Sequence, residues 1–236
     1  MNESDEGRAD ERRKPASRYS LFVGIAFLIV IVVATANTLR TRDDGILGTS
    51  ATERGEPLPQ FAVPELVGET EGDANVFQDD CATGSNPCPA DDRRTPACQV
   101  DLPAVIRVCD LFDKPLVISF WFTGGAECLP TQDVVDEVAG RFAGRVNFLS
   151  INVRDDRDKA REIVAERGWG IPVGWDADGA VSNLYRVGGC PTVAFAYPGG
   201  LLSEAKIGID ELSTEQLTAD VELLLGESER RAETDR

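Results

Sequence analysis

Histidine is absent from this sequence of 236 residues, and basic residues are scarce. Without histidine the chain has no Ser–His or Cys–His nucleophile pair, no histidine metal ligand and no side chain that ordinarily titrates near neutral pH. The 24 Lys and Arg are outnumbered by 41 Asp and Glu, which gives a formal charge of −17. Because phosphate binding needs clustered basic residues, we expect no nucleic-acid partner.

What the sequence does contain is an apolar fraction of 42%, enough for a folded core, and six cysteines. The cysteines are the main reactive side chains that remain once histidine is excluded. An even number of them suits a compartment in which disulfides form, so their interpretation depends on whether the chain is exported.

A long uncharged stretch near the N-terminus, residues 19–39, points to export. At about 1.5 Å per residue it is long enough to cross a ~30 Å hydrocarbon core as a helix. Basic residues crowd its N-terminal side, and Asp43 and Asp44 follow its other end, so we expect residues 1–18 in the cytoplasm and the rest outside. A signal-peptidase-like site ending at Ala36 leaves a cleaved, secreted form as the alternative.

The rest of the chain divides by composition into a linker, a domain and a tail. Residues 40–57 are polar and indicate a linker, residues 58–226 carry the apolar patterning of a domain, and residues 227–236 indicate a disordered tail. Within the domain, residues 68–103 form a loop-like insertion that holds three cysteines among Asp, Pro and Gly.

Apolar periodicity predicts alternating strands and helices after residue 103. Strands are expected at residues 116–122, 146–153, 173–175, 192–197 and 201–207, and helices at 131–142, 158–167 and 180–185. The last helix is expected to begin at Ser213, with a capping box completed by Gln216, and to stop at Gly226. This order predicts an α/β fold with a mixed central sheet and helices on both faces.

A charged run follows the strand expected at residues 146–153. Residues 154–158 read Arg-Asp-Asp-Arg-Asp. Because charged side chains are seldom buried, we interpret this run as a solvated turn.

Two stretches resemble the thioredoxin-like superfamily. Phe120-Trp-Phe-Thr-Gly-Gly-Ala-Glu-Cys128, followed by Asp-Glu-Val-Ala at 136–139, is similar to the thioredoxin pattern F-W-x-x-W-C-x-x-C and its D-E-[IV]-A helix. Residues 176–192 resemble the D-x-D-G…Y-x-V-x-G-x-P-T segment of the TlpA/ResA-type membrane-anchored redoxins. The resemblance covers roughly residues 58–226 and implies a thioredoxin fold, with Pro191 as a cis-proline beside the active-site cysteines.

The active site that this resemblance implies is degenerate. In an ungapped alignment Gly125 replaces the first, nucleophilic cysteine and Cys128 holds the second, resolving position. The resemblance places a buried aspartate where this chain has Ser119. An alternative frame takes Cys128 as a lone nucleophile in a C-x-P-T motif, with Thr131 in place of the second cysteine, but it needs a three-residue insertion.

Cys190 is the substitute for the missing thiol. It precedes Pro191, and the resemblance implies that this residue lies beside the active-site loop, where it would face Cys128. Three states remain open for the pair: a permanent disulfide, a reversible redox pair, or free thiols with Cys128 reactive on its own. We take Cys128 and Cys190 as the candidate catalytic residues. The candidate substrate groove consists of Trp121, Gly125, Pro191 and Thr192.

The other four cysteines are candidates for structural disulfides that stabilise the insertion. They allow three connectivities, of which we favour Cys81–Cys88 with Cys98–Cys109. A zinc site is disfavoured because the four thiols lack paired C-x₂₋₄-C spacing. Copper delivery by a related thioredoxin-fold family needs C-x₃-C and a histidine, so we expect neither a metal nor a cofactor.

The resemblance implies a membrane-anchored, extracytoplasmic thiol–disulfide oxidoreductase that acts on thiols or disulfides of exported proteins, with a membrane electron donor as a further partner. A non-catalytic thioredoxin-fold binding module for an exported protein is the alternative. A peroxidase is disfavoured, because Thr123 lies five residues before Cys128 instead of three and Glu127 would oppose a thiolate.

Overall fold

The computed structural model describes residues 23–33, 54–76, 82–83, 86–87, 95–125, 128–207 and 212–234. Two units, Met1–Asp44 and Gly45–Arg236, are separately compact. In the first, residues 23–33 form a helix with exposed apolar side chains. The membrane segment expected at residues 19–39 extends beyond this helix into residues outside the described ranges, and no helix within those ranges is both long and apolar enough to span a membrane.

The second unit is built on a five-stranded mixed sheet in the order β10-β9-β6-β7-β8. Its strands are β6 Leu116–Trp121, β7 Asn147–Val153, β8 Val173–Asp176, β9 Thr192–Tyr197 and β10 Leu201–Ile207. β6, β7 and β8 run parallel, whereas β9 pairs antiparallel with both β6 and β10. Every residue of the central strand β6 is buried, as its nearly continuous apolar run predicts.

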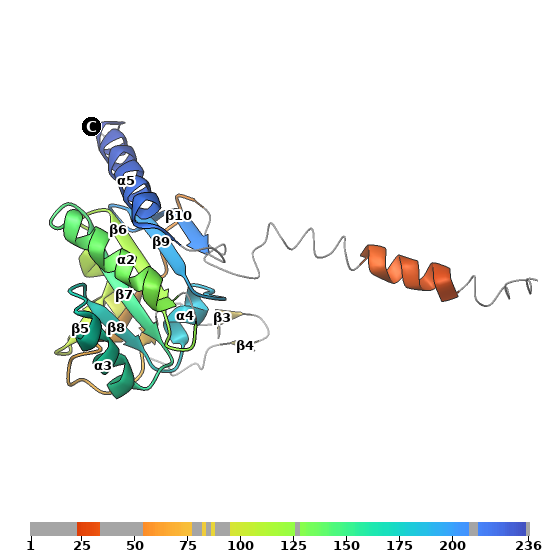
Figure 1. Cartoon of the computed structure of the whole chain (residues 1–236), viewed down its shortest axis with the longest axis horizontal. Coiled ribbons are helices and arrows are strands. Elements are labelled where there is room, and N and C mark those ends of the chain that lie inside the picture. The colour runs from red at the N-terminus through yellow and green to blue at the C-terminus, as the bar shows by residue number, and fades with distance from the viewer. Residues whose placement is uncertain are drawn as a thin grey trace, which may run out of the picture. The chain divides into compact units, whose positions relative to one another are not determined.

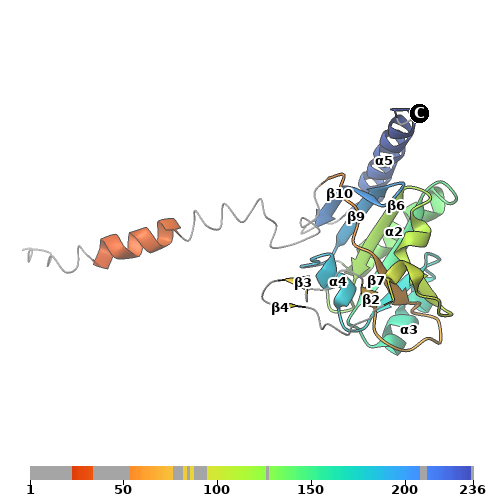
Figure 2. The same cartoon turned by 180° about the vertical axis from the view of Figure 1, so that it is seen from behind.

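Helices cover both faces of this sheet, as predicted. Val117 of β6 packs in one core with α2 (Cys128–Arg141) and α5 (Thr214–Thr234), which lie side by side in Figure 1. Ile118, the next residue of the strand, packs in a second core with Val181 of α4 (Ala180–Leu184). Successive side chains of a strand point to opposite faces, so α4 lies on the face opposite α2. Figure 2 shows α4 near β2 (Asn75–Val76).

A third helix, α3 (Arg157–Arg167), connects β7 to β8. The connections β6-α2-β7 and β7-α3-β8 step across the sheet in the same direction. Because such parallel crossovers are right-handed, both helices lie on the same face. The indole N–H of Trp169, just after α3, donates to Asp133 of α2 at 2.8 Å, and the two helices are thereby linked.

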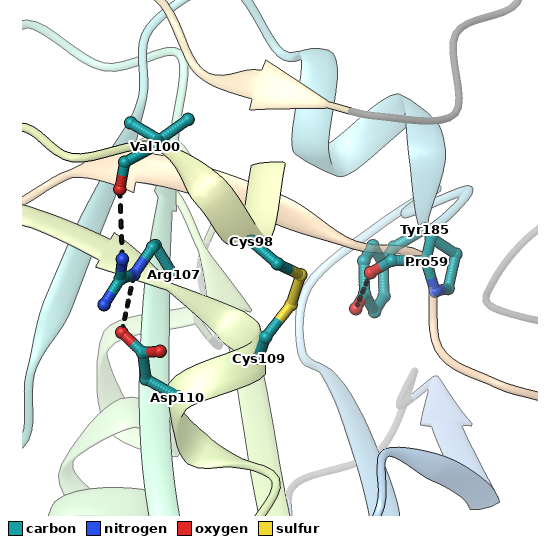
Figure 3. The surroundings of a disulfide bond; sticks show 7 residues. All are labelled: Pro59, Cys98, Val100, Arg107, Cys109, Asp110 and Tyr185. Carbon is teal, nitrogen blue, oxygen red and sulfur yellow. Dashed lines mark hydrogen bonds and ion pairs between the residues drawn. A yellow bond between two sulfur atoms is a disulfide. The ribbon is translucent and has the colours of Figure 1, made fainter. Parts of the chain in front are cut away.

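A small sheet in the order β2-β1-β5 precedes the main one. It comprises β2, β1 (Phe61–Pro64) and β5 (Val105–Arg107), and two short 3₁₀ helices flank β5, η1 (Ala97–Gln99) and η2 (Val108–Leu111). The buried hydroxyl of Tyr185 donates to the carbonyl of Pro59 at 2.8 Å and holds the start of this segment on the core (Figure 3). Two-residue strands β3 (Ala82–Thr83) and β4 (Asn86–Pro87) pair within the expected insertion.

The C-terminal helix corrects one prediction. Its start follows the expected capping box, since Ser213 and Gln216 exchange backbone-to-side-chain hydrogen bonds. The expected stop at Gly226 is wrong, because α5 continues to Thr234. Glu227 accepts a hydrogen bond from the Tyr197 hydroxyl, and the Arg231 guanidinium lies 4.2 Å from the Tyr197 ring centre. These contacts offset the helix penalty of one glycine, about 1 kcal/mol.

The charged run at residues 154–158 is the expected solvated turn only in part: Arg154, Asp156 and Asp158 are exposed, whereas Asp155 and Arg157 are partly buried. The guanidinium of Arg157 donates to four backbone carbonyl groups in residues 65–70, at distances of 2.6 to 3.1 Å. Its charged plane also lies 4.7 Å from the ring centre of Trp175. Arg157 therefore fastens the loop after β1 to the start of α3.

Asp176, at the end of β8, is fully buried and caps the start of α4. Its two carboxylate oxygens accept hydrogen bonds from the backbone N–H groups of Val181 and Ser182, at 3.0 and 2.8 Å. Burial raises the pKa of this carboxyl above its usual range, although the two amides act in the opposite direction. The folded protein therefore binds the Asp176 proton more tightly than the unfolded chain does.

We expect this proton to appear in the pH dependence of stability. A carboxyl whose pKa is higher in the folded state contributes stability that is full below the unfolded pKa, about 3.9, and is lost as the pH rises through the folded pKa. The unfolding free energy of the wild type, relative to Asp176→Asn, should therefore be greater at acid pH than at neutral pH. Denaturant unfolding over a pH series measures this difference, and a constant difference would contradict the expectation.

A buried disulfide at the candidate active site

Cys128 lies at the start of α2, directly after the loop that leaves the central strand β6. Its backbone N–H donates to the carbonyl of Gly125 at 3.3 Å, which closes the turn that leads into the helix. The side chain is only 1% exposed and packs in an apolar cluster with Trp121, Leu66 and Trp169. The positive end of the α2 dipole therefore lies next to a sulfur that water barely reaches.

Cys190 lies across the site from Cys128 and is bonded to it. The two Cα atoms are 5.3 Å apart, within the usual range for a disulfide. The Cys190–Pro191 peptide bond is cis. Cys190 is half-buried and Pro191 is buried, and the hydroxyl of Thr192 donates to the Gly189 carbonyl at 2.7 Å, which holds this loop together. The structure thus brings the two candidate catalytic residues together, with Pro191 beside them.

In the ungapped frame, Gly125 aligns with the first cysteine of the thioredoxin pattern. A Cβ atom added to it would lie 2.4 Å from the sulfur of Cys128 and 3.1 Å from the Phe122 ring. A side chain at position 125 would therefore meet the sulfur of Cys128 directly, as the partner cysteine of a C-x-x-C pair does. This geometry favours the ungapped alignment over the frame that makes Cys128 a lone nucleophile.

Of the remaining groove candidates, Trp121 is 1% exposed and Thr192 is fully buried. Trp121 packs edge-on against Trp169, with ring centres 5.1 Å apart. Both residues therefore support the site from within, whereas Gly125 and the residues before Pro191, Gly188 to Cys190, are at least partly exposed.

A carboxylate that sequence reasoning missed holds the active-site loop in place. Asp155 accepts hydrogen bonds from the backbone N–H of Thr123 at 2.7 Å and from its hydroxyl at 2.8 Å. The Asn152 amide donates to the same carboxylate at 2.7 Å. Thr123 follows β6 and Asp155 follows β7, so both lie at the carboxyl edge of neighbouring parallel strands. The position of Asp155 just after a predicted strand could have indicated a contact with the active-site loop. The neighbouring charged residues instead suggested a solvated turn.

The buried aspartate of thioredoxins is replaced by a neutral pair. Ser119 is 2% exposed, and its hydroxyl donates to the side-chain oxygen of Gln132, which is 1% exposed, at 2.9 Å. Gln132 lies one helical turn after Cys128 on the same face of α2. A serine and an amide do not exchange protons near neutral pH, so this pair is no proton carrier.

Among the other cysteines, Cys98 and Cys109 form a disulfide between η1 and η2, with Cα atoms 5.7 Å apart (Figure 3). Next to it, Arg107 donates to the carbonyl of Val100 and pairs with Asp110. Cys81 and Cys88 lie outside the described residues. Within the described ranges, no three His, Cys, Asp or Glu side chains gather in a way that would hold a metal ion.

Comparison with known proteins shows similarity to thiol-disulfide oxidoreductases. No protein-family profile matches the chain. The thiol-disulfide oxidoreductase ResA of Oceanobacillus iheyensis is 22% identical over 200 residues, which cover 84% of this chain and 86% of ResA.

Solved structures show the same fold. A thiol:disulfide interchange protein of the thioredoxin family from Chlorobium tepidum has a TM-score of 0.53 at 16% identity, covering 74% of this chain and 99% of that one. A DsbF homologue from Corynebacterium diphtheriae has a TM-score of 0.52 at 16% identity, covering 73% and 88%. The chain therefore has the thioredoxin fold, and it is similar to the oxidoreductase ResA along most of the length of both proteins.

Proposed function

We propose that the chain is a thiol–disulfide oxidoreductase whose redox-active pair is Cys128 and Cys190. The observation that carries the proposal is the disulfide between the start of α2 and the residue before the cis-proline. The pair thus joins the two segments that flank the site, and one of its residues is partly exposed. The similarity to the oxidoreductase ResA supports the same chemistry.

We further propose that the domain acts outside the membrane, on thiols or disulfides of exported proteins. The apolar, uncharged residues 19–39 and the basic residues before them support an uncleaved anchor with its N-terminus in the cytoplasm. A secreted form cleaved near Ala36 remains the alternative. Cys98–Cys109 is a second disulfide on the same domain, and disulfides persist in oxidising compartments. A membrane protein that supplies electrons would be the second partner.

Graded reduction of the full chain in membranes tests both statements. We expect the Cys128–Cys190 bond to open in dithiol buffers near about −200 mV, well before Cys98–Cys109, because catalytic disulfides are more easily reduced than structural ones. Acid quenching, alkylation and peptide mass spectrometry measure each pair separately, and Cys98–Cys109 is the internal control. In intact cells, a membrane-impermeant maleimide should label Cys190, the partly exposed member of the reduced pair, if the domain lies outside.

A non-catalytic binding module is the second candidate. Burial of Cys128 to 1% exposure, glycine at position 125 and the absence of the thioredoxin aspartate favour a permanent bond. On that account, Cys128–Cys190 would persist below about −300 mV, together with Cys98–Cys109. The same titration therefore distinguishes the two functions.

A further inference from the structure

We infer that Cys190, and not Cys128, is the sulfur that exchanges with the substrate, and that Cys128 is the buried resolving thiol; this rests on the proposed function of the pair. Thiol–disulfide exchange requires a thiolate to approach one sulfur from the side opposite the sulfur that leaves. Which of the two sulfurs reacts is therefore decided by access, and the two residues differ in access.

Access to the sulfur of Cys128 is blocked from the loop side and from the core. The backbone of Gly125 lies against it, since a methyl group there would be only 2.4 Å from the sulfur. The Phe122 ring lies 3.1 Å from the same added methyl position and so covers this side of the loop as well. On the inner side, Trp121 and Leu66 belong to the apolar cluster that buries the residue to 1% exposure. Within the described residues, these contacts leave the Cys128 side chain almost no exposed surface that an incoming peptide thiol could approach.

Access to Cys190 is open along its own loop. The residue is partly exposed and follows Gly188, which is exposed, and Gly189. A Cβ atom added to Gly189 would have no atom within 4 Å, so the space beside this residue is empty. The hydrogen bond from Thr192 to the Gly189 carbonyl keeps the loop in this open form.

The surroundings of Cys128 also suit a leaving sulfur. A thiolate released there is stabilised by the N-terminal end of the 14-residue helix α2. Thr131 and Gln132 lie three and four residues further, on the same face of the helix, and are 5% and 1% exposed. Within the described residues, the Thr131 hydroxyl and the Gln132 amide nitrogen have no hydrogen-bond partner. Both are donors that a thiolate on Cys128 would satisfy.

The exchange then runs in two balanced steps. A substrate thiolate attacks the Cys190 sulfur, forms a mixed disulfide with it, and expels Cys128 as a thiolate. The second thiolate of the substrate then attacks the first substrate sulfur, which is bonded to Cys190 in the mixed disulfide. This yields the substrate disulfide and a Cys190 thiolate. The substrate is oxidised, the protein pair is reduced by two electrons, and the two substrate protons pass through solvent to the cysteines. Run backwards, Cys190 attacks a substrate disulfide and Cys128 resolves it.

Cys190 thus takes over the attacking role that Gly125 has lost, while Cys128 keeps the resolving role of its position in the alignment. The sequence analysis took both cysteines as candidate catalytic residues and left a reactive Cys128 as one of three open states. The assignment of separate roles depends on burial, which the cysteine spacing does not reveal.

Mapping of a glutathione adduct on the full chain tests the inference. The oxidised wild type is mixed briefly with reduced glutathione, quenched in acid and digested, and the adduct is located by mass spectrometry. We expect it on Cys190. In reduced variants that keep only one cysteine of the pair, oxidised glutathione should modify Cys190 in Cys128→Ser on the order of 100-fold faster than Cys128 in Cys190→Ser, with each site followed by its own peptide.

A bulkier residue beside Cys190 provides an independent check. Gly189→Leu should slow adduct formation about tenfold by narrowing the approach. Gly140→Leu, at an equally open glycine in α2, is the matched control and should leave the rate unchanged. The wild-type mapping stands even if Cys128→Ser or Cys190→Ser does not fold.

The outcomes separate the inference from the proposed function. An adduct on Cys128 overturns the inference and leaves the pair redox-active. No adduct on either sulfur, together with a bond that survives strongly reducing buffer, overturns both. An adduct on Cys190 that Gly189→Leu slows and Gly140→Leu does not supports both.

Discussion

Gly125→Cys should move the disulfide of Cys128 from Cys190 to the new residue. The added Cβ lies 2.4 Å from the Cys128 sulfur, so the new side chain is close enough for its sulfur to bond to Cys128 after a small shift of the loop. We expect the Cys128–Cys190 link to fall at least about tenfold under oxidising conditions, which corresponds to about 1.4 kcal/mol or 30 mV. Disulfide mapping of the oxidised protein measures the ratio of the two links.

Gly124→Cys is the matched control. A Cβ at Gly124 has only the Phe122 ring near it, at 4.0 Å, so the new thiol would not reach Cys128. The Cys128–Cys190 link should persist in this variant, with the added thiol free. If Cys128–Cys190 also remains the main link in Gly125→Cys, Gly125 does not occupy the place of the missing cysteine.

Arg157→Lys should destabilise the domain by about 2–3 kcal/mol, although it keeps the positive charge. Four carbonyls in residues 65–70 accept hydrogen bonds from the branched, planar guanidinium. An ammonium group has no such fork and would lose several of these charged hydrogen bonds. Arg161 also donates to the carbonyls of Leu66 and Gly68, so the loss falls mainly on the bonds to Glu65 and Thr70. Burial, followed by the charge of Arg161, lowers the pKa of Arg157. These surroundings disfavour a positive charge, so the charge of the lysine would need hydrogen bonds that its ammonium group cannot all form.

Denaturant unfolding of the full chain, followed by tryptophan fluorescence, measures this loss. Trp175 under the guanidinium should report the change locally. Arg154→Lys, in the same charged run but exposed, is the control and should change the unfolding free energy by less than about 0.5 kcal/mol. Equal stability of the two variants would mean that Arg157 acts as an ordinary surface charge.

Features encoded by local interactions were predicted well. The apolar run at residues 116–122 forms the buried strand β6, and the hairpin strands at 192–197 and 201–207 have the expected bounds. The capping box of Ser213 and Gln216 is present because both partners lie within one helical turn. Helices on both faces of a mixed sheet follow from the order of these elements.

Features that depend on partners distant in the sequence were not predicted. The continuation of α5 past Gly226 needs Tyr197, a residue of β9. The role of Arg157 needs carbonyl groups about ninety residues earlier in the chain. Asp155 is a structural carboxylate only because the sheet places Thr123 beside it. A charged run looks the same in sequence whether it faces solvent or another segment.

The amino-acid sequence by itself determined the composition of the site: a thiol at residue 128, a glycine at 125, a cysteine before Pro191, and no histidine. Periodicity determined the order of strands and helices, because side-chain burial repeats with the local backbone geometry. Only the tertiary structure decided that Cys128 is buried whereas Cys190 is partly exposed. Access to Cys128 and Cys190 depends on Gly125, Phe122 and the open loop at Gly189, and folding brings these separate segments together around one bond.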